Sequence, residues 1–454
     1  MYDEQPVVAT LRREISNGKL WIGRAVVVAF AMGAGLVVVA FGRLSDEALQ
    51  LFGRFEDAYW WGPLLWTPLA TALIVWATRK FAPGAAGSGI PQVMAALDPS
   101  TPKVHRQLFV SLKLSLAKVF LTTSGLLAGL SLGREGPSVQ IAAGILHSAR
   151  RWIPTTAQIS DSSLLVAGGA AGIAAAFNTP LGGVMFAIEE LSKKSGERNI
   201  SLVVIAIVLA GLVGVSLNGN NSFFGVIRVE QITGALLLPG LVAALITGAA
   251  GGLFARLLIV SIGQLSPDRW SRLRARSPII FAALCGLVVA VIGVVTHGET
   301  YGSGYAHNRE MLESGADANV FYALLKLVAT WLTTWAGVPA GVFAPSLAIG
   351  GAIGNDVAQL FAFSSPATII ALGMAGFLAA VTQAPLTAFI IVMEMIDGHA
   401  MVLSLMASTL LASGVSRLVT TPLYPALAAL QTRRIPSSHE PSGESAPVVR
   451  HAEH

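Results

Sequence analysis

Long apolar runs, interrupted by glycine and proline more often than by charge, dominate the chain. The uncharged runs cover residues 25–42, 58–78, 162–188, 199–227, 231–255, 277–298, 327–355 and 357–393. Several of them exceed the roughly 20 apolar residues that cross the hydrocarbon of a membrane as a helix. The last run contains Pro366 and Pro385, so it must hold more than one element. Backbone groups in lipid must be paired internally, and the alternation of barrel strands is absent, so the pattern predicts an all-α integral membrane protein.

Composition agrees with this prediction. Of 454 residues, 54% are hydrophobic and 12% are charged, whereas ordinary soluble domains carry about 25% charged residues. The net charge of +5 reflects topology, because cytoplasmic flanks collect lysine and arginine. The basic residues that flank the first and last apolar segments are Arg12, Arg13, Lys19, Arg24, Arg433 and Arg434. Their positions predict that both termini are cytoplasmic.

The charged and polar residues divide the chain into three parts. Residues 1–20 form a polar leader that we expect on the cytoplasmic side, and residues 21–434 form one transmembrane domain. Residues 435–454 are rich in proline, serine, glutamate and histidine, which predicts a disordered cytoplasmic tail too short for a regulatory domain. One cysteine, Cys285, allows no intramolecular disulfide, and the eight histidines are scattered, so no metal site is expected.

The transmembrane domain repeats itself. Lys118 precedes the motif GREGP, and Lys326 precedes the motif GVFAP, in each case by 15 residues. The segment AGIAAAFNTPL (171–181) is echoed by AGFLAAVTQAPL (375–386). A chance match of glycine- and proline-rich segments is the alternative, but the shared order and spacing favour two repeat halves at about 21–217 and 232–434. Repeated halves are typical of transporters, whose binding site lies where broken helices of both halves meet.

Three motifs combine glycine, proline and a helix start inside apolar sequence. They are Gly87-Ser88-Gly89-Ile90-Pro91, Gly133-Arg134-Glu135-Gly136-Pro137 and Gly341-Val342-Phe343-Ala344-Pro345. Each predicts a loop-to-helix junction at membrane depth, because glycine permits an open backbone and proline suits a first helical turn. Such a junction exposes N–H donors and the positive end of a helix dipole, which an anion can satisfy. The alternative is that the motifs are kinks or tight helix crossings.

In this order the three motifs resemble the signature motifs of the CLC family of chloride channels and transporters. The resemblance extends to Asn178-Thr179-Pro180-Leu181 with Glu189-Glu190, to Gln383-Ala384-Pro385-Leu386 and to Pro422-Leu423-Tyr424, and it covers about residues 20–434. It implies a homodimer in a bacterial inner or plasma membrane, with one pore in each subunit. Each subunit would contain about 18 tilted, partly broken helices in two repeats of inverted topology.

The resemblance implies a chloride site. Its ligands would be the hydroxyls of Ser88 and Tyr424 and the backbone N–H groups of Val342 and Phe343. Serine in the first motif is typical of relatives that prefer chloride, and proline of relatives that prefer nitrate; fluoride-selective relatives typically lack this serine motif and Arg134. Read alone, Ser88 could be a helix-capping serine and Tyr424 an interfacial tyrosine.

Two glutamates carry the expected coupling to protons. Glu135 is expected among the N–H groups of a helix start, where its carboxylate competes with an anion for the same place. It would therefore act both as a gate and as a proton carrier. The alternative is a static ion pair with Arg134. Glu189 is echoed by Glu394, at the same distance from the repeat proline, whereas Glu190 has no acidic counterpart. The resemblance makes Glu190 the internal proton glutamate found in exchangers; channels commonly lack an acid there. A merely solvated Glu190 at a helix end is the alternative.

Lys118 and Lys326 lie deep in apolar sequence at matched positions. We expect them to attract anions at long range and to pair with carboxylates, without binding chloride directly; the alternative is that they snorkel to an interface. Neither a His-Glu-x-x-His set nor a P-loop is present, and no nucleotide, nucleic acid or other cofactor is expected. The sequence therefore predicts exchange of chloride for protons. A passive chloride channel of the same fold is the second interpretation, and a membrane enzyme or another transporter the third.

Overall fold

The computed structural model describes residues 18–157, 159–195, 200–219, 223–224, 234–266, 268–314, 319–363 and 365–433. Most of the expected leader, the expected tail, and Arg12, Arg13 and Arg434 lie outside these residues. Within them every regular element is helical, and the only β-type pairing is an isolated bridge between two glycines. The all-α fold expected from the sequence is therefore confirmed.

The helices fall into two sets that follow the predicted repeat. The first set is α2 (Gly18–Ala58), α3 (Pro63–Phe81), α4 (Ile90–Leu97), α5 (Leu112–Leu127), α6 (Glu135–Ser148), α7 (Asp161–Phe177), α8 (Pro180–Phe186), α9 (Ser192–Ser195) and α10 (Ile200–Asn218). The second set is α11 (Leu237–Gly263), α12 (Arg269–Arg276), α13 (Pro278–Val295), α14 (Tyr305–Ser314), α15 (Tyr322–Ala336), α16 (Phe343–Leu360), α17 (Pro366–Thr382), α18 (Pro385–Met395), α19 (Val402–Val419) and α20 (Leu423–Thr432). Among the described residues, five helical stretches are long and apolar enough to cross a membrane alone. Several of the other helices are much shorter, such as α4 with 8 residues and α8 with 7, as expected for a protein whose helices break at membrane depth.

Local chemistry sets matching boundaries in the two halves. Asn178 caps the end of α7 and Gln383 caps the end of α17, and both of these residues are left-handed, with φ of 57° and 56°. A proline then starts the next helix, Pro180 in α8 and Pro385 in α18. Because a left-handed residue ends a helix and proline suits the first turn of the next one, both halves make the same break.

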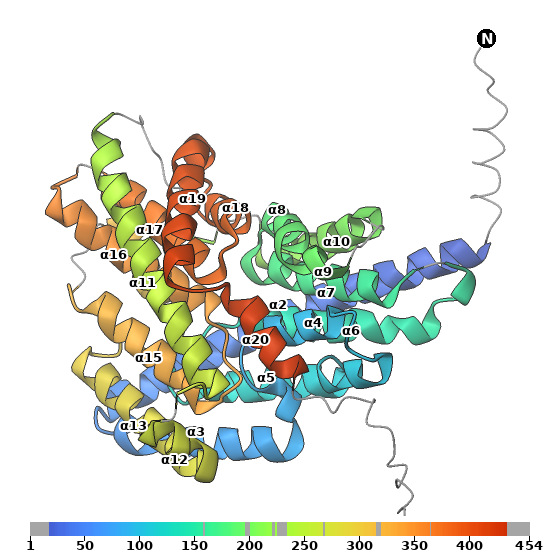
Figure 1. The fold of residues 1–454 in the computed structure, drawn as a ribbon, viewed down its shortest axis with the longest axis horizontal. Helices are drawn as coiled ribbons and strands as arrows, with labels where there is room; N and C mark the ends of the chain where they lie inside the picture. The colour runs from blue at the N-terminus through green and yellow to red at the C-terminus, as the bar shows by residue number, and fades with distance from the viewer. Residues whose placement is uncertain are drawn as a thin grey trace, which may run out of the picture.

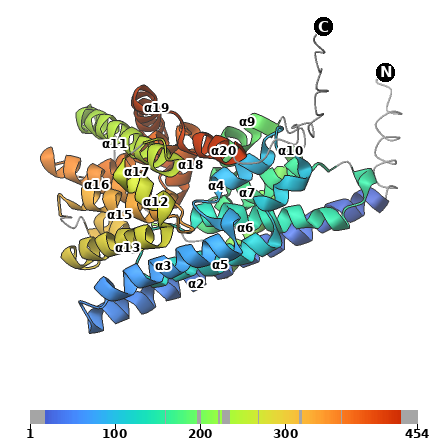
Figure 2. The ribbon, with the colours of Figure 1, turned by 60° about the horizontal axis from the view of Figure 1, so that its bottom comes forward.

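The two sets of helices lie side by side and are joined at the centre. In Figure 1 the helices of the second set lie mainly on the left and those of the first set mainly on the right, and α2 runs beneath both sets in Figure 2. The last helix, α20, crosses back to pack against α4 of the first set (Figure 1). Helix α8 packs against α18 across the boundary between the sets. The C-terminal helix therefore reaches the first of the three glycine-proline motifs.

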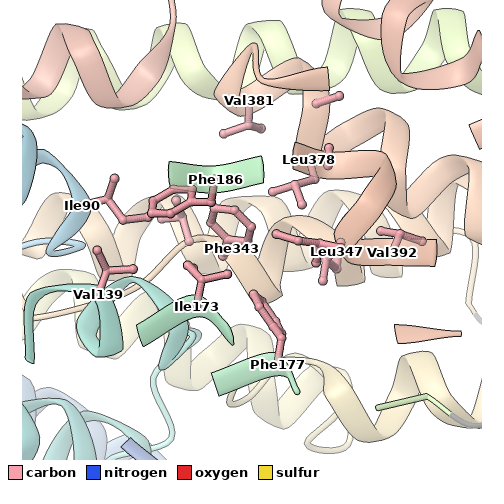
Figure 3. Packing of buried hydrophobic residues seen from close by; sticks show 14 of the residues in the cluster. Ile90, Val139, Ile173, Phe177, Phe186, Phe343, Leu347, Leu378, Val381 and Val392 are labelled. Carbon is pink, nitrogen blue, oxygen red and sulfur yellow. The ribbon is translucent and has the colours of Figure 1, made fainter. Parts of the chain in front are cut away.

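One hydrophobic core extends through both sets. Figure 3 shows Ile90 of α4, Phe186 of α8 and Phe343 of α16 lying close together in this core. Large apolar side chains also cover the outside, and Leu403 and Leu418 are 78% and 88% exposed. An outer surface of this kind is expected where lipid is the solvent. The core thus holds the helix starts at the centre of an integral membrane protein.

Candidate functional site

The three glycine-proline motifs meet at one junction. Gly133 and Gly341, equivalent residues of the two halves, exchange backbone hydrogen bonds of 2.7 and 3.0 Å. Gly87 joins them through a second pair: its N–H donates to the carbonyl of Val338, and its carbonyl accepts from Ala340, both at 3.2 Å. The loops that precede α4, α6 and α16 therefore form one hydrogen-bonded unit made by both halves.

Glycine is required at this junction because the helix starts approach so closely. A Cβ atom on Gly136 would collide with the hydroxyl of Ser88, and a Cβ atom on Gly341 would lie 2.7 Å from the carbonyl oxygen of Gly133. Gly89 has a φ of +108° and would also collide, 2.5 Å from the carbonyl oxygen of Gly136. The starts of α4, α6 and α16 are therefore in contact. The positive ends of the dipoles of the longer helices α6 and α16 consequently lie close to each other.

Two hydroxyls lie at this junction. Ser88 is 6% exposed, and Tyr424, the second residue of α20, is fully buried. The rings of Tyr424 and Phe343 are parallel, with an interplanar angle of 3° and centroids 6.3 Å apart. The Tyr424 hydroxyl interacts with Ser88, yet neither oxygen meets hydrogen-bond geometry with any described residue. Because buried hydroxyls ordinarily have partners, this pair indicates a place for a polar ligand.

Glu135 lies at the same junction. It is the first residue of α6 and is 1% exposed. Its carboxyl group lies against Gly133, within reach of the backbone N–H groups of Glu135 itself and Ala344. One carboxylate oxygen has no hydrogen-bond partner among the described residues. A carboxylate in this position stands where an anion attracted by the two helix starts would stand.

The structure does not contain the ion pair between Arg134 and Glu135 that the sequence analysis considered; both residues are described, and their side chains form no salt bridge with each other. Nη1 of Arg134 instead donates to Oδ1 of Asp46 at 2.5 Å and to the carbonyl oxygen of Gly42 at 2.8 Å. Both partners belong to α2. Glu135 is therefore left without a salt bridge although an arginine precedes it in the chain.

Glu190 lies in a different local structure. It is 7% exposed and belongs to a single π-helical turn, Ala187–Leu191, that follows α8. One of its carboxylate oxygens has no partner among the residues described. Glu135 and Glu190 both act electrostatically on the hydroxyl of Tyr424. Tyr424 therefore links the surroundings of the two glutamates. Short π-helical turns often mark functional positions. Lys193 also acts electrostatically on Glu190, and the Lys194 side chain lies outside the described residues.

Glu189 and Glu394 hold the two halves together. The carboxylate of Glu189 accepts the N–H groups of residues 386 and 387 at the start of α18, at 3.3 and 2.7 Å. Glu394 in turn accepts those of residues 181 and 182 at the start of α8, at 3.0 and 2.7 Å. Each half thus supplies the negative cap for a helix start of the other half. This reciprocal cap gives Glu189 a scaffold role, which it shares with its repeat counterpart Glu394.

The two matched lysines are the main correction to the sequence analysis. Both are fully buried, so neither snorkels to an interface, and neither forms a salt bridge with a described carboxylate. Nζ of Lys118 instead donates to the carbonyls of Ala85 and Gly87 at 2.8 and 2.6 Å. Nζ of Lys326 donates to the carbonyls of residues 300, 301 and 302 at 2.8, 3.3 and 2.9 Å. Buried loop carbonyls need such donors because a buried carbonyl without a partner is costly.

The loop held by Lys326 reveals a repeat that sequence reasoning missed. Gly302-Ser303-Gly304 precedes α14 as Gly87-Ser88-Gly89 precedes α4, and each lysine binds the carbonyl of the first glycine. The signal was present in the sequence as a second Gly-Ser-Gly. It was overlooked because no proline follows it.

Two cavities border Arg134, and the smaller of them also borders Glu135. A cavity of about 30 Å³ is lined by Ser45, Asp46, Arg134, Glu135, Ser303 and Asn308 among others. A larger one of about 1420 Å³ shares Asp46, Arg134 and Ser303 with it and also contains His297, His307 and His399. No group of three metal-ligating side chains occurs in the described part of the chain. The small cavity is large enough for water or one small ion. It adjoins Glu135, and it shares lining residues with the large cavity, which we call the vestibule.

Known proteins match this chain along most of its length. The family model "Voltage gated chloride channel" matches residues 70–417. The H(+)/Cl(-) exchange transporter ClcA of Cronobacter sakazakii is 30% identical over 415 residues, covering 86% of each chain. The protein of the same name from Yersinia pestis is 28% identical over 451 residues, covering 91% of this chain and 90% of its own length.

Solved structures share the fold. A slow cyanobacterial Cl⁻/H⁺ antiporter matches with a TM-score of 0.77 and 23% identity, over 90% of this chain and 98% of its own. A CLC-type fluoride/proton antiporter matches with a TM-score of 0.74 and 23% identity, over 89% and 97%. At these identities the likeness concerns the fold.

Proposed function

The chain belongs to the voltage-gated chloride channel (CLC) family, and on that premise we propose that it exchanges chloride for protons across a membrane. The observation that carries this proposal is the junction of helix starts from both halves, where Glu135 lies near the buried hydroxyls of Ser88 and Tyr424, which have no partner beyond each other among the described residues. The similar curated proteins are named as exchange transporters. A passive gated chloride channel is the alternative, and the acid at Glu190 favours the exchanger.

Chloride would bind between Ser88, Tyr424 and the N–H groups of Val342 and Phe343. Hydroxyls, N–H groups and helix dipoles supply partial positive charge, which can hold a halide and still release it. The two buried lysines do not add a full charge as ligands, because backbone carbonyls already accept from them. Since one structural relative is a fluoride/proton antiporter, the preference for chloride rests on the serine of the first motif rather than on the fold.

Glu135 would act as gate and external proton carrier. Ionised, its carboxylate occupies the outer end of the junction and blocks the anion path. Protonated, it loses its attraction for the helix-start N–H groups and can turn into the small cavity beside it, so that chloride passes. Its return with loss of the proton to the vestibule then closes the path. Glu190 would exchange protons with Glu135 from the opposite side.

The assembly would be a homodimer in a bacterial inner or plasma membrane, with both termini in the cytoplasm. Leu181 of α8, Leu212 of α10 and Leu410 of α19 are 55%, 55% and 51% exposed, so these helices leave apolar side chains that a second subunit could cover. The similar curated proteins are transporters, and no enzymatic activity is proposed. Light scattering of the purified protein in detergent should give the mass of two chains, and a monomer mass would contradict the homodimer.

Flux measurements in proteoliposomes test the exchange directly. With crossed chloride and pH gradients, the wild-type reversal potential should depend on both gradients, whereas a passive channel would follow chloride alone. We expect Glu135→Ala to keep chloride flux and lose proton movement, since it removes the gate and the carrier together. Glu190→Gln should also lose proton movement. Glu47→Gln, a change of an exposed acid on α2, serves as the control and should remain coupled. Full proton coupling in either of the first two variants would contradict the assignment.

A further inference from the structure

Gly42 and Asp46 of helix α2 together bind the side chain of Arg134, and we call this pair the seat of Arg134. Gly42 and Asp46 are four residues apart, so they lie on the same face of the helix. The guanidinium of Arg134 packs over Gly42, where a Cβ atom would lie 3.6 Å from its central carbon, and it donates to both the Gly42 carbonyl and the Asp46 carboxylate. The Arg134 side chain is 18% exposed and that of Asp46 is 59% exposed. The seat therefore lies at the border of the vestibule, and Asp46 lines both cavities.

This seat determines which charges Glu135 meets. Arg134 adjoins it in the chain, Asp46 of α2 acts on it electrostatically, and it acts in turn on Tyr424 of α20. Helix α16 contributes the N–H of Ala344, and Tyr305 of α14 acts on Arg134. With Asp46 in place, the charge of Arg134 is compensated and its Nη1 donates to Asp46 and Gly42. After Asp46, Glu135 is the carboxylate that acts most strongly on Arg134.

We propose that Asp46 is a positioning residue of the exchange, which holds Arg134 on α2 and so leaves Glu135 free to take up a proton and leave the anion path. The inference rests on the function proposed above. Loss of Asp46 would let Arg134 attract Glu135, and this attraction favours the ionised, blocking form of the carboxylate. Because protonation then requires more acid, exchange would be limited to lower pH.

The pH profile of exchange tests this role. In Asp46→Asn we expect the pH of half-maximal chloride/proton exchange to fall by about one unit, which corresponds to about 1.4 kcal/mol at the carboxylate. Asp46→Glu, which keeps the charge, should restore a profile close to that of the wild type. Glu47→Gln removes the same charge from the next residue of α2 and should leave the profile in place. Asp46→Ser provides a second neutral variant if Asp46→Asn does not fold.

Other titratable groups of the vestibule must be separated from this effect. They include His297, His307, His399, Glu56, Glu299, Glu310, Glu394 and Asp397. For this reason each variant is also measured in a Glu135→Gln background, which cannot ionise at the gate. There the change at Asp46 should no longer shift the pH dependence of chloride flux. A shift of equal size in both backgrounds would show that Asp46 acts through another group.

The outcomes distinguish this inference from the proposed function. If the wild type moves no protons with chloride, the exchange itself is wrong. If the wild type is coupled and Asp46→Asn keeps the wild-type pH profile, the positioning role is wrong and the exchange stands. A uniform fall of flux at every pH, with no displacement of the profile, would indicate a merely structural role for Asp46 and would also overturn the proposal.

Discussion

A methyl group added at Gly341 would separate the two halves at the point where they meet. In Gly341→Ala the new Cβ atom would lie 2.7 Å from the carbonyl oxygen of Gly133 and 2.9 Å from Cδ of Pro137, well inside ordinary contact distance. The pair of hydrogen bonds between Gly133 and Gly341 must therefore stretch or break. Each buried group left unpaired costs about 1–3 kcal/mol, and the loss of one of the two bonds leaves two such groups, so we expect a loss of about 2–6 kcal/mol in stability.

The same change should weaken chloride binding, because the next residues after Gly341 supply the proposed N–H ligands. Thermal unfolding of the purified protein in detergent measures the first effect, and calorimetric titration with chloride measures the second. We expect a fall in affinity of about tenfold or more, equivalent to about 1.4 kcal/mol. Gly33→Ala is the matched control, because no neighbour lies within 4 Å of the added Cβ on α2. A Gly341→Ala protein with wild-type stability and chloride affinity would refute the reasoning.

Three further changes probe the site and its scaffold. Ser88→Pro should shift anion preference from chloride toward nitrate, and an unchanged ranking in competition flux assays would count against Ser88 as a ligand. Lys326→Met leaves the three buried carbonyls of residues 300–302 without their donor, so thermal unfolding should show a loss of stability of about 3–5 kcal/mol. Unchanged stability would contradict the role of Lys326 as the donor to this loop. Glu394→Gln weakens the charged cap on residues 181–182 and should cost about 1–2 kcal/mol, while a matching stability to wild type would show that the cap is dispensable.

The local rules of the sequence predicted the breaks of the fold well. Pro366 and Pro385 start helices α17 and α18, as their interruption of the apolar run 357–393 predicted. The convergence of the three glycine-proline motifs was also predictable, because free N–H groups at membrane depth need a common partner. The sequence therefore predicted that the three glycine-proline motifs form the junction, and the backbone hydrogen bonds of Gly87, Gly133 and Gly341 confirm it.

The long-range pairing of side chains was not predictable in the same way. Arg134 and Asp46 are 88 residues apart, and nothing in the local pattern of α2 marks Asp46 as the partner. Lys118 was expected to pair with a carboxylate, but the chain supplies carbonyls of a loop instead. Both choices depend on which groups the fold leaves unsatisfied, and that is known only once the helices are packed.

The account depends most on a halide resting where the helix starts of the two halves converge. Anomalous scattering from crystals soaked in bromide, a heavier halide than chloride, locates such an ion directly. We predict a peak within hydrogen-bonding distance of the Ser88 and Tyr424 hydroxyls and of the Phe343 N–H. Bromide found only at the surface or in the vestibule, with the junction empty in a crystal of the Glu135→Gln protein, would contradict the central claim.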